Sequence, residues 1–274
     1  MERAFDIEPL EATFGAVVTG LKLATLDDAA WADLHTAWLK YALLIFPGQH
    51  LNREEQITFA KRFGKLEFEM APLSNVKADG AIITDADNSD MMKVLKGNMG
   101  WHCDSTYMPV QAKGAVFRAD VVPGSGGQTG WADMRAAYDA LDYARQSKVE
   151  SLAAYHSLYY SQSKLGHQPK PGSDYSGYGF HNGPVPLRPL VKVHPETGRK
   201  SLVIGRHAHN IPGMAKGESE QFLQELVDFA CQPPRHSRIA GDPVHEAALP
   251  DPGNRLGIGK LQSPLASAAR PIGR

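Results

Sequence analysis

The segment Trp101-His-Cys-Asp-Ser-Thr106 holds an imidazole and a carboxylate two residues apart. Side chains of an extended chain alternate with a period of two, so we expect His102 and Asp104 to point to one side and Cys103 to the other. An imidazole, a carboxylate and a distant second histidine form the facial ligand set of non-haem Fe(II) oxygenases. The segment therefore predicts two of the three protein ligands of an iron site.

Two other histidine segments compete with this one as metal sites. His194-Pro-Glu196 lies in a Pro, Thr and Gly context that predicts a hairpin turn in preference to a metal site. His207-Ala-His209 follows the apolar residues 202–204, and its histidines suit pocket lining or local hydrogen bonding better than metal binding. The pattern at 101–106 remains the one on which a reaction can be built.

Composition limits the class of protein. With 274 residues, 42% of them hydrophobic and 22% charged, the chain can bury a large core and suits one large domain. A net charge of -1 gives no electrostatic reason to expect nucleic acid or an anionic membrane as a partner. We expect no signal peptide and no membrane span, and two cysteines, Cys103 and Cys231, are too few for a disulfide framework. A cytoplasmic location is the expectation.

Helix and strand patterns mix without a regular alternation. Strands are expected over residues 14–23, 43–46, 114–122, 187–193 and 200–204, the last two flanking a turn as a hairpin. Helices are expected from a capping box at Thr25–Asp28 to about Lys40, from Asn52 with Glu55 to about Phe63, and over 134–141 and 218–231. Residues 79–97 suit an active-site lid, 124–130 a hairpin loop and 165–186 a long loop. Short strands with helices outside favour an α+β, double-sheet barrel.

Several motifs together carry a resemblance to a known family. The segment Asn98-Met-Gly-Trp-His-Cys-Asp-Ser-Thr-Tyr107, with the motifs at 126–129 and 133–141, resembles the taurine dioxygenase and 2,4-dichlorophenoxyacetate dioxygenase family. Within it, the chain is most similar to the phenoxypropionate (aryloxyalkanoate) dioxygenases. Further segments fit in order at 41–49, 57–64, 156–158, 186–190 and 194–198, so that the resemblance covers roughly residues 5 to 241.

The resemblance implies a double-stranded β-helix (jelly roll) with flanking helices, and an Fe(II)- and 2-oxoglutarate-dependent dioxygenase that also uses O2. His102 and Asp104 match the family's first two iron ligands. Thr129 matches a threonine that hydrogen-bonds a 2-oxoglutarate carboxylate, and Asn98 a polar residue near the co-substrate. The implied reaction hydroxylates a small acid of the aryloxyalkanoate or sulfonate type and releases succinate and CO2.

The chain departs from the family pattern between Arg235 and His236. By the resemblance, about three dozen residues are absent there, including the second iron-binding histidine and the arginine that clamps 2-oxoglutarate. The expected domain is therefore a jelly roll over 1–241, incomplete near its C-terminus, followed by a disordered tail over 242–274. A degenerate, non-catalytic relative is the alternative function.

Four residues are candidates for binding the acidic substrate: Arg206, His207, His236 and Arg238. His236 falls near the position at which relatives bind the substrate's acidic group. A solvated or packing role is an equally good interpretation of each. The family pattern is also compatible with a homo-oligomer.

Overall fold

The computed structural model describes residues 5–73, 97, 99–119, 129–166, 179–239 and 256–258. The predictions for Asn98, most of the proposed lid, the glycine cluster, most of the long loop and almost all of the tail lie outside these residues. Within the described part of the chain, no helix is both long and apolar enough to cross a membrane.

The chain divides into two compact units, and each brings together segments that are distant in sequence. The first unit takes in residues 1–82, 114–133 and 233–264, and the second takes in 83–113, 134–232 and 265–274. Each unit has its own cluster of buried hydrophobic side chains. The mixture of helices and short sheets agrees with the predicted α+β class.

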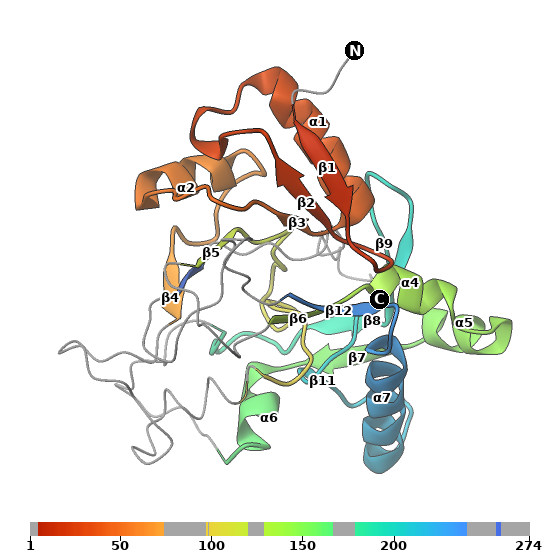
Figure 1. The fold of residues 1–274 in the computed structure, drawn as a ribbon. Coiled ribbons are helices and arrows are strands. Elements are labelled where there is room, and N and C mark those ends of the chain that lie inside the picture. The colour runs from red at the N-terminus through yellow and green to blue at the C-terminus, as the bar shows by residue number, and fades with distance from the viewer. Residues whose placement is uncertain are drawn as a thin grey trace. The chain divides into compact units, whose positions relative to one another are not determined.

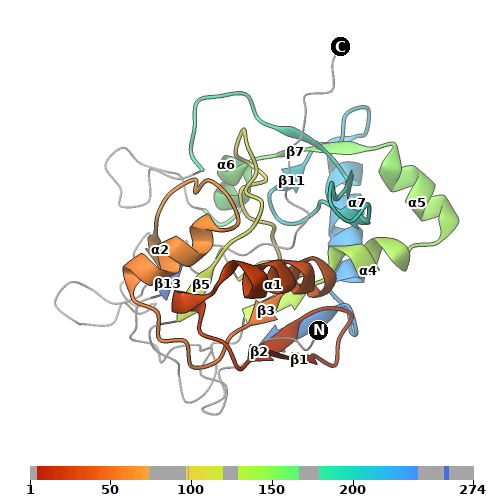
Figure 2. The ribbon, with the colours of Figure 1, turned by 90° about the horizontal axis from the view of Figure 1, so that it is seen from above.

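The first unit begins with a sheet covered by a helix (Figure 1; Figure 2). Strand β1 (Asp6–Pro9) pairs antiparallel with β2 (Ala16–Thr19), which pairs parallel with β3 (Leu44–Ile45). Helix α1 (Asp28–Tyr41) buries Leu34 and Trp38 against this sheet. The strands are shorter than the predicted 14–23 and 43–46, but both lie where the sequence places them.

The start of α1 corrects one expectation. Leu23–Thr25 form a short 3-10 helix, η1, and the N-cap of α1 is Asp27, whose carboxylate accepts a hydrogen bond from Ala30 N at 2.8 Å. The predicted capping box at Thr25 is therefore wrong, and the cap lies two residues later. Thr25 cannot cap α1, because its own backbone belongs to η1.

Helix α2 (Arg53–Lys61) confirms the second capping prediction. Asn52 Oδ1 accepts from Glu55 N at 3.0 Å, and Glu55 Oε2 accepts from Asn52 N at 2.7 Å. The helix ends at Lys61, two residues before the predicted Phe63.

Two small sheets also belong to the described part of the first unit, in the orders β12-β6 and β4-β13-β5. Their strands are β4 (Ala71–Leu73), β5 (Phe117–Ala119), β6 (Thr129–Ala132), β12 (His236–Ile239) and β13 (Leu256–Ile258).

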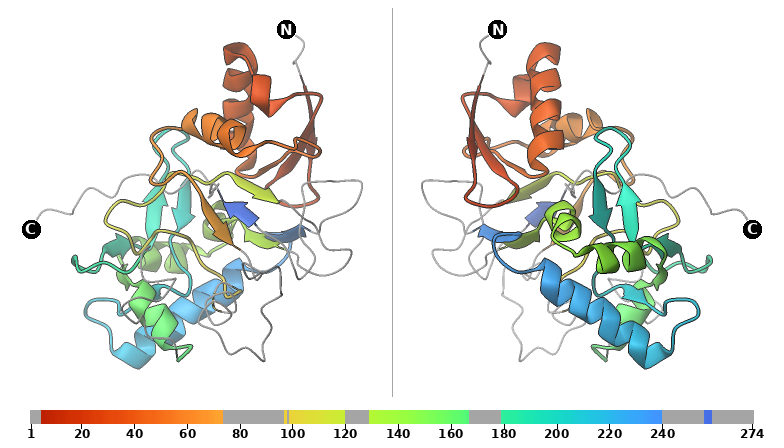
Figure 3. Two further views of the ribbon diagram at one scale, coloured as in Figure 1. Left: turned by 90° about the vertical axis from the view of Figure 1, so that its left-hand side faces the viewer. Right: turned by 90° about the vertical axis from the view of Figure 1, so that its right-hand side faces the viewer.

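In the second unit, the part of the chain that the structure describes combines helices with small sheets. Its helices are α4 (Met134–Asp139), α5 (Tyr143–Glu150), α6 (Leu158–Ser163) and α7 (Lys216–Ala230), and its strands are β7 (Ala153–His156), β8 (Leu187–Pro189), β9 (Val191–Val193), β10 (Lys200–Leu202) and β11 (Ala208–His209). Figure 3 shows the long helix α7 beside α4, and Leu223 and Leu226 of α7 are buried in this unit's core. The predicted helices at 134–141 and 218–231 are confirmed.

The predicted hairpin around residues 194–198 is confirmed with one change. β9 and β10 pair antiparallel, and His194 Nδ1 accepts from the backbone N–H groups of Glu196 and Thr197, each at 3.2 Å. His194 is therefore a turn residue, as the sequence indicates. The expected single strand over 187–193 is two strands, because β8 pairs with β7 in another sheet.

Candidate functional site

His102 and Asp104 converge in the second unit. His102 Nε2 lies 3.4 Å from Asp104 Oδ1, and the two side chains keep 21% and 22% of their surface exposed. Both atoms are metal-ligating types, and solvent reaches both side chains. An ion placed between them would meet one nitrogen and one carboxylate oxygen.

The tautomer of His102 follows from its other nitrogen. Nδ1 lies 2.7 Å from the carbonyl oxygen of Gly100, which can only accept a hydrogen bond, so Nδ1 carries the proton. The Nε2 lone pair is then directed at the Asp104 side. A backbone carbonyl that fixes the ring through its second nitrogen is a common support for metal-ligating histidines.

The backbone of this segment differs from the predicted extended chain. Residues 101–103 have no regular structure, residues 104–107 form a turn, and Ser105 has a left-handed φ of 52°. The expectation of an extended run through Thr106 is therefore wrong after Cys103, because the turn begins at Asp104. The predicted side-chain directions are confirmed: Cys103 Sγ accepts from Gln111 Nε2 at 3.5 Å, whereas His102 faces Asp104.

The backbone of Gly205 lies in close contact with this segment. A Cβ atom at Gly205, whose φ is +131°, would lie 3.0 Å from His102 Cα and 3.2 Å from Trp101 O. The next residue, Arg206, donates its backbone N–H to Trp101 O at 3.0 Å. Only glycine lets the two backbones approach so closely. Gly205 and Arg206 thus hold the backbone of Trp101 and His102 in place.

His207 is a neutral imidazole beside the ligand pair. Its ring lies 5.6 Å from that of His102, edge to face, and is 3% exposed. Ser161 Oγ donates to Leu158 O, so its contact of 2.8 Å with His207 Nδ1 makes that nitrogen the donor. Burial is the largest cause that lowers the pKa of His207 well below its ordinary value, and the positive charge of Arg206 acts in the same direction. His207 therefore presents an uncharged ring next to His102.

Arg206 lies beside the backbone that precedes the ligands. A Cβ on Gly97 would come within 3.0 Å and 3.1 Å of its two terminal guanidinium nitrogens. Arg206 and His207 are thus brought to the His102 region, as expected of pocket residues. A contact of Arg206 or His207 with the substrate stays a prediction.

Three other predicted site residues, Thr129, His236 and Arg238, belong to the first unit. Thr129 is exposed at the start of β6, and its register partner on β12 is Ile239. His236 and Arg238 lie on β12 opposite Ala132 and Gly130. The β6–β12 pair therefore gathers Thr129, His236 and Arg238 on two adjoining strands.

Sequence reasoning missed two buried cations in the second unit. Arg188 on β8 is 3% exposed and donates to the carbonyl oxygens of Thr106 and Pro109 at 3.1 Å and 3.3 Å, and to that of Met108. Lys192 on β9 is 7% exposed, and its Nζ donates to Gln111 Oε1 at 2.5 Å. Both lie in the strand predicted over 187–193, and the strand pattern gave no signal of their burial.

The two converging residues fit an Fe(II) ion in part. A neutral imidazole nitrogen and a carboxylate oxygen are suitable donors, and the Gly100 carbonyl holds the imidazole in the required tautomer. Among the described residues, no group of three His, Cys, Asp or Glu side chains could hold a metal ion. His102 and Asp104 are therefore two candidate ligands, and their binding of a metal stays a prediction.

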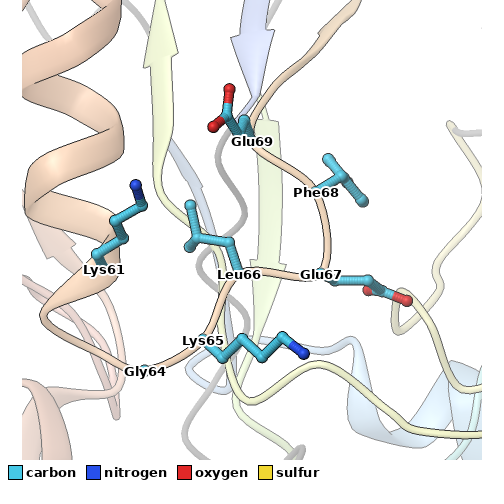
Figure 4. Close-up of a pocket in the computed structure, with 7 residues that line it drawn as sticks. All are labelled: Lys61, Gly64, Lys65, Leu66, Glu67, Phe68 and Glu69. Carbon is cyan, nitrogen blue, oxygen red and sulfur yellow. The ribbon is translucent and has the colours of Figure 1, made fainter.

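A surface cavity of about 580 Å³ lies in the first unit, outside the one that carries His102. It follows α2 and is lined by Lys61, Gly64, Lys65, Leu66, Glu67, Phe68 and Glu69 (Figure 4). Its charged side chains are of both signs, and none of the predicted site residues contributes to it. It has no part in the candidate site.

Comparison with known proteins gives consistent matches. The family model described as taurine catabolism dioxygenase TauD, TfdA family matches residues 6–239. The (S)-phenoxypropionate/alpha-ketoglutarate-dioxygenase of Sphingobium herbicidovorans is 64% identical, over 91% of this chain and 99% of its own. The alpha-ketoglutarate-dependent 2,4-dichlorophenoxyacetate dioxygenase of a Burkholderia species is 34% identical, over 88% and 85%. The crystal structure of AAD-2 in complex with Mn(II) and N-oxalylglycine matches with a TM-score of 0.80 and 32% identity, over 94% and 88%.

The alignment with the Sphingobium protein also bears on the predicted internal gap. It spans 285 positions, and 91% of 274 residues is about 249, so about 36 positions hold no residue of this chain. The place of these positions along the chain is a separate matter, and the predicted gap after Arg235 stays a prediction. In the structure, the backbone continues through this point, with Arg235 O accepting from Asp133 N at 2.7 Å.

Proposed function

Because this chain belongs to the taurine catabolism dioxygenase (TauD, TfdA) family, we propose that it is an Fe(II)- and 2-oxoglutarate-dependent dioxygenase of aryloxyalkanoate acids. The observation that carries the proposal is the 64% identity to an (S)-phenoxypropionate/alpha-ketoglutarate-dioxygenase. The convergence of His102 and Asp104 supports it independently.

The proposed reaction balances with one molecule of each reactant. 2-Oxoglutarate and O2 give succinate and CO2, and the second oxygen atom hydroxylates the substrate carbon that bears the ether oxygen. The hydroxylated product is a hemiketal when the substrate is 2-phenoxypropionate, and it breaks down to phenol and pyruvate. When bound, Fe(II) supplies the activation of O2 that no amino-acid side chain provides.

The chain's own residues hold and orient the reactants. His102 and Asp104 would bind the iron, with the Gly100 carbonyl keeping the His102 lone pair directed outward. We assign Thr129 a hydrogen bond to a carboxylate of 2-oxoglutarate, and its exposed position at the start of β6 supports this role. The acidic group of the substrate calls for cationic or imidazole donors, and His236 and Arg238 are our candidates on the adjoining strand.

We also propose that the chain has the jelly-roll fold of this family. The match to the AAD-2 structure at a TM-score of 0.80 supports this architecture. The observed sheets are short, and the most C-terminal strands pair with the centre of the chain, as β12 does with β6. The comparisons give no reason to prefer a non-catalytic relative.

The test is succinate release from 2-oxoglutarate in the presence of Fe(II), ascorbate and each enantiomer of 2-phenoxypropionate. We expect substrate-dependent succinate and equimolar phenol, abolished in His102→Ala. His35→Ala, which changes a histidine on α1, is the matched control and should retain turnover. Equal succinate from wild type and His102→Ala would refute the proposal.

A further inference from the structure

The ligand pair lies on a loop, so its geometry depends on what holds the loop. Residues 101–103 are irregular, residues 104–107 turn, and neither belongs to a sheet. Sites built on loops need support from neighbouring side chains to keep the geometry that a metal requires. The supports of this loop are therefore part of the site.

A chain of side chains reaches the residue between the two ligands. Lys192 Nζ donates to Gln111 Oε1 at 2.5 Å, and Gln111 Nε2 donates to Cys103 Sγ at 3.5 Å. Gln111 is 5% exposed and Lys192 7% exposed, so this connection is shielded from water. Holding Cys103 on this side keeps its two neighbours facing the other way.

Arg188 ties down the turn that follows Asp104. Its guanidinium donates to the carbonyl oxygens of three residues between Thr106 and Pro109. Ser105 Oγ closes the same turn by accepting from Ala112 N at 3.0 Å. The loop is thus held at Cys103, between the ligands, by Lys192 through Gln111, and after Asp104 by Arg188.

Burying Lys192 and Arg188 together lowers the stability of the fold. Lys192 and Arg188 are both buried cations, and burial followed by the positive charge of Arg188 lowers the pKa of Lys192. A methionine or leucine on β9 would pack in the same place without burying a charge. Groups that break the rules of stable packing are most often retained where they serve a site.

We propose that Lys192, acting through Gln111 and Cys103, is a positioning residue that sets His102 and Asp104 for metal binding. The inference rests on the proposed function, because it presumes that this pair binds a metal. Nothing in it requires Lys192 to touch the metal or the substrate.

The test measures metal affinity and thermal stability separately. Co(II), added to the purified apoprotein and followed by its visible absorption, is the probe. The variants are Lys192→Met, Gln111→Leu and the conservative Lys192→Arg, with Lys200→Met as the matched control. Lys200 is a partly exposed lysine of the neighbouring strand β10, paired with Glu150.

We expect Lys192→Met and Gln111→Leu to weaken Co(II) binding by about 10-fold or more, the size of effect typical for residues that orient metal ligands. Lys192→Arg should recover most of the affinity, and Lys200→Met should match wild type. The melting temperature of Lys192→Met should be unchanged or higher, because a buried charge is removed. Wild-type affinity in Lys192→Met would overturn the proposal, and so would a fall in affinity that only accompanies a fall in melting temperature. Absence of Co(II) binding by wild type would instead refute the proposed metal site, and this inference with it.

Discussion

Replacing Lys192 by methionine should change how the stability of the fold depends on pH. Burial, with the adjacent positive charge of Arg188, lowers the pKa of Lys192 from 10.5 to about 8. Between these two values the unfolded chain binds more protons than the folded one, so the folded state gains stability as pH rises. Methionine has no proton to lose, and this gain should vanish in the variant.

The size of the effect follows from the two pKa values. A difference of about 2.5 between them corresponds to a cost of about 3 kcal/mol at pH 7, at 1.36 kcal/mol per unit. Between pH 7 and pH 9 the folded lysine loses its proton, and about 1 kcal/mol of this cost is recovered. For a chain of this size, this corresponds to roughly 2–4 °C in melting temperature.

The assay is thermal unfolding of wild type and Lys192→Met at matched ionic strength from pH 7 to pH 9. The difference between the two proteins isolates Lys192, since the other titrating groups are common to both. We expect the melting temperature of wild type to rise by roughly 2–4 °C relative to that of the variant as pH rises from about 7 to 9. A constant difference, or one of the opposite sign, would refute the view that Lys192 is buried as a destabilised cation.

Three further changes test other features. Gly205→Ala should place a Cβ 3.0 Å from His102 Cα at a φ of +131°, costing about 1–3 kcal/mol and weakening Co(II) binding, as measured by unfolding and by titration. Thr129→Val should raise the KM for 2-oxoglutarate about 10-fold through loss of about 1.4 kcal/mol of hydrogen bonding, while leaving Co(II) affinity unchanged; an unaltered KM would remove Thr129 from the site. Asp27→Ala should cost about 1 kcal/mol of unfolding free energy in urea by removing the cap on Ala30 N, and no loss would mean that α1 is capped otherwise.

Features of the fold that depend on neighbouring residues were predictable from the sequence. The capping box of Asn52 and Glu55 and the turn at His194 were both found as expected, because each is made within four residues. The predicted start of α1 was wrong. Both Thr25 and Asp27 can cap a helix, and Asp27 does so because Thr25 belongs to η1. The choice depends on how the preceding residues pack.

The supports of the candidate site could not be predicted in this way. Arg188 and Lys192 lie 79 to 82 residues along the chain from the groups that they bind, and a strand pattern cannot tell a solvated cation from a buried one. His102 and Asp104 were predictable as a pair because only Cys103 separates them. The environment that gives this pair its geometry comes from β8, β9 and the residues around Gly205, which only the folded chain brings together.

The central claim is that this chain is an iron- and 2-oxoglutarate-dependent dioxygenase that uses His102 and Asp104. The most direct measurement is the ratio of succinate to phenol formed from 2-oxoglutarate and (S)-2-phenoxypropionate with Fe(II), in wild type and in Asp104→Ala. We predict a ratio near one in wild type and neither product in the variant. No succinate from wild type, or the same yield from Asp104→Ala, would contradict the claim.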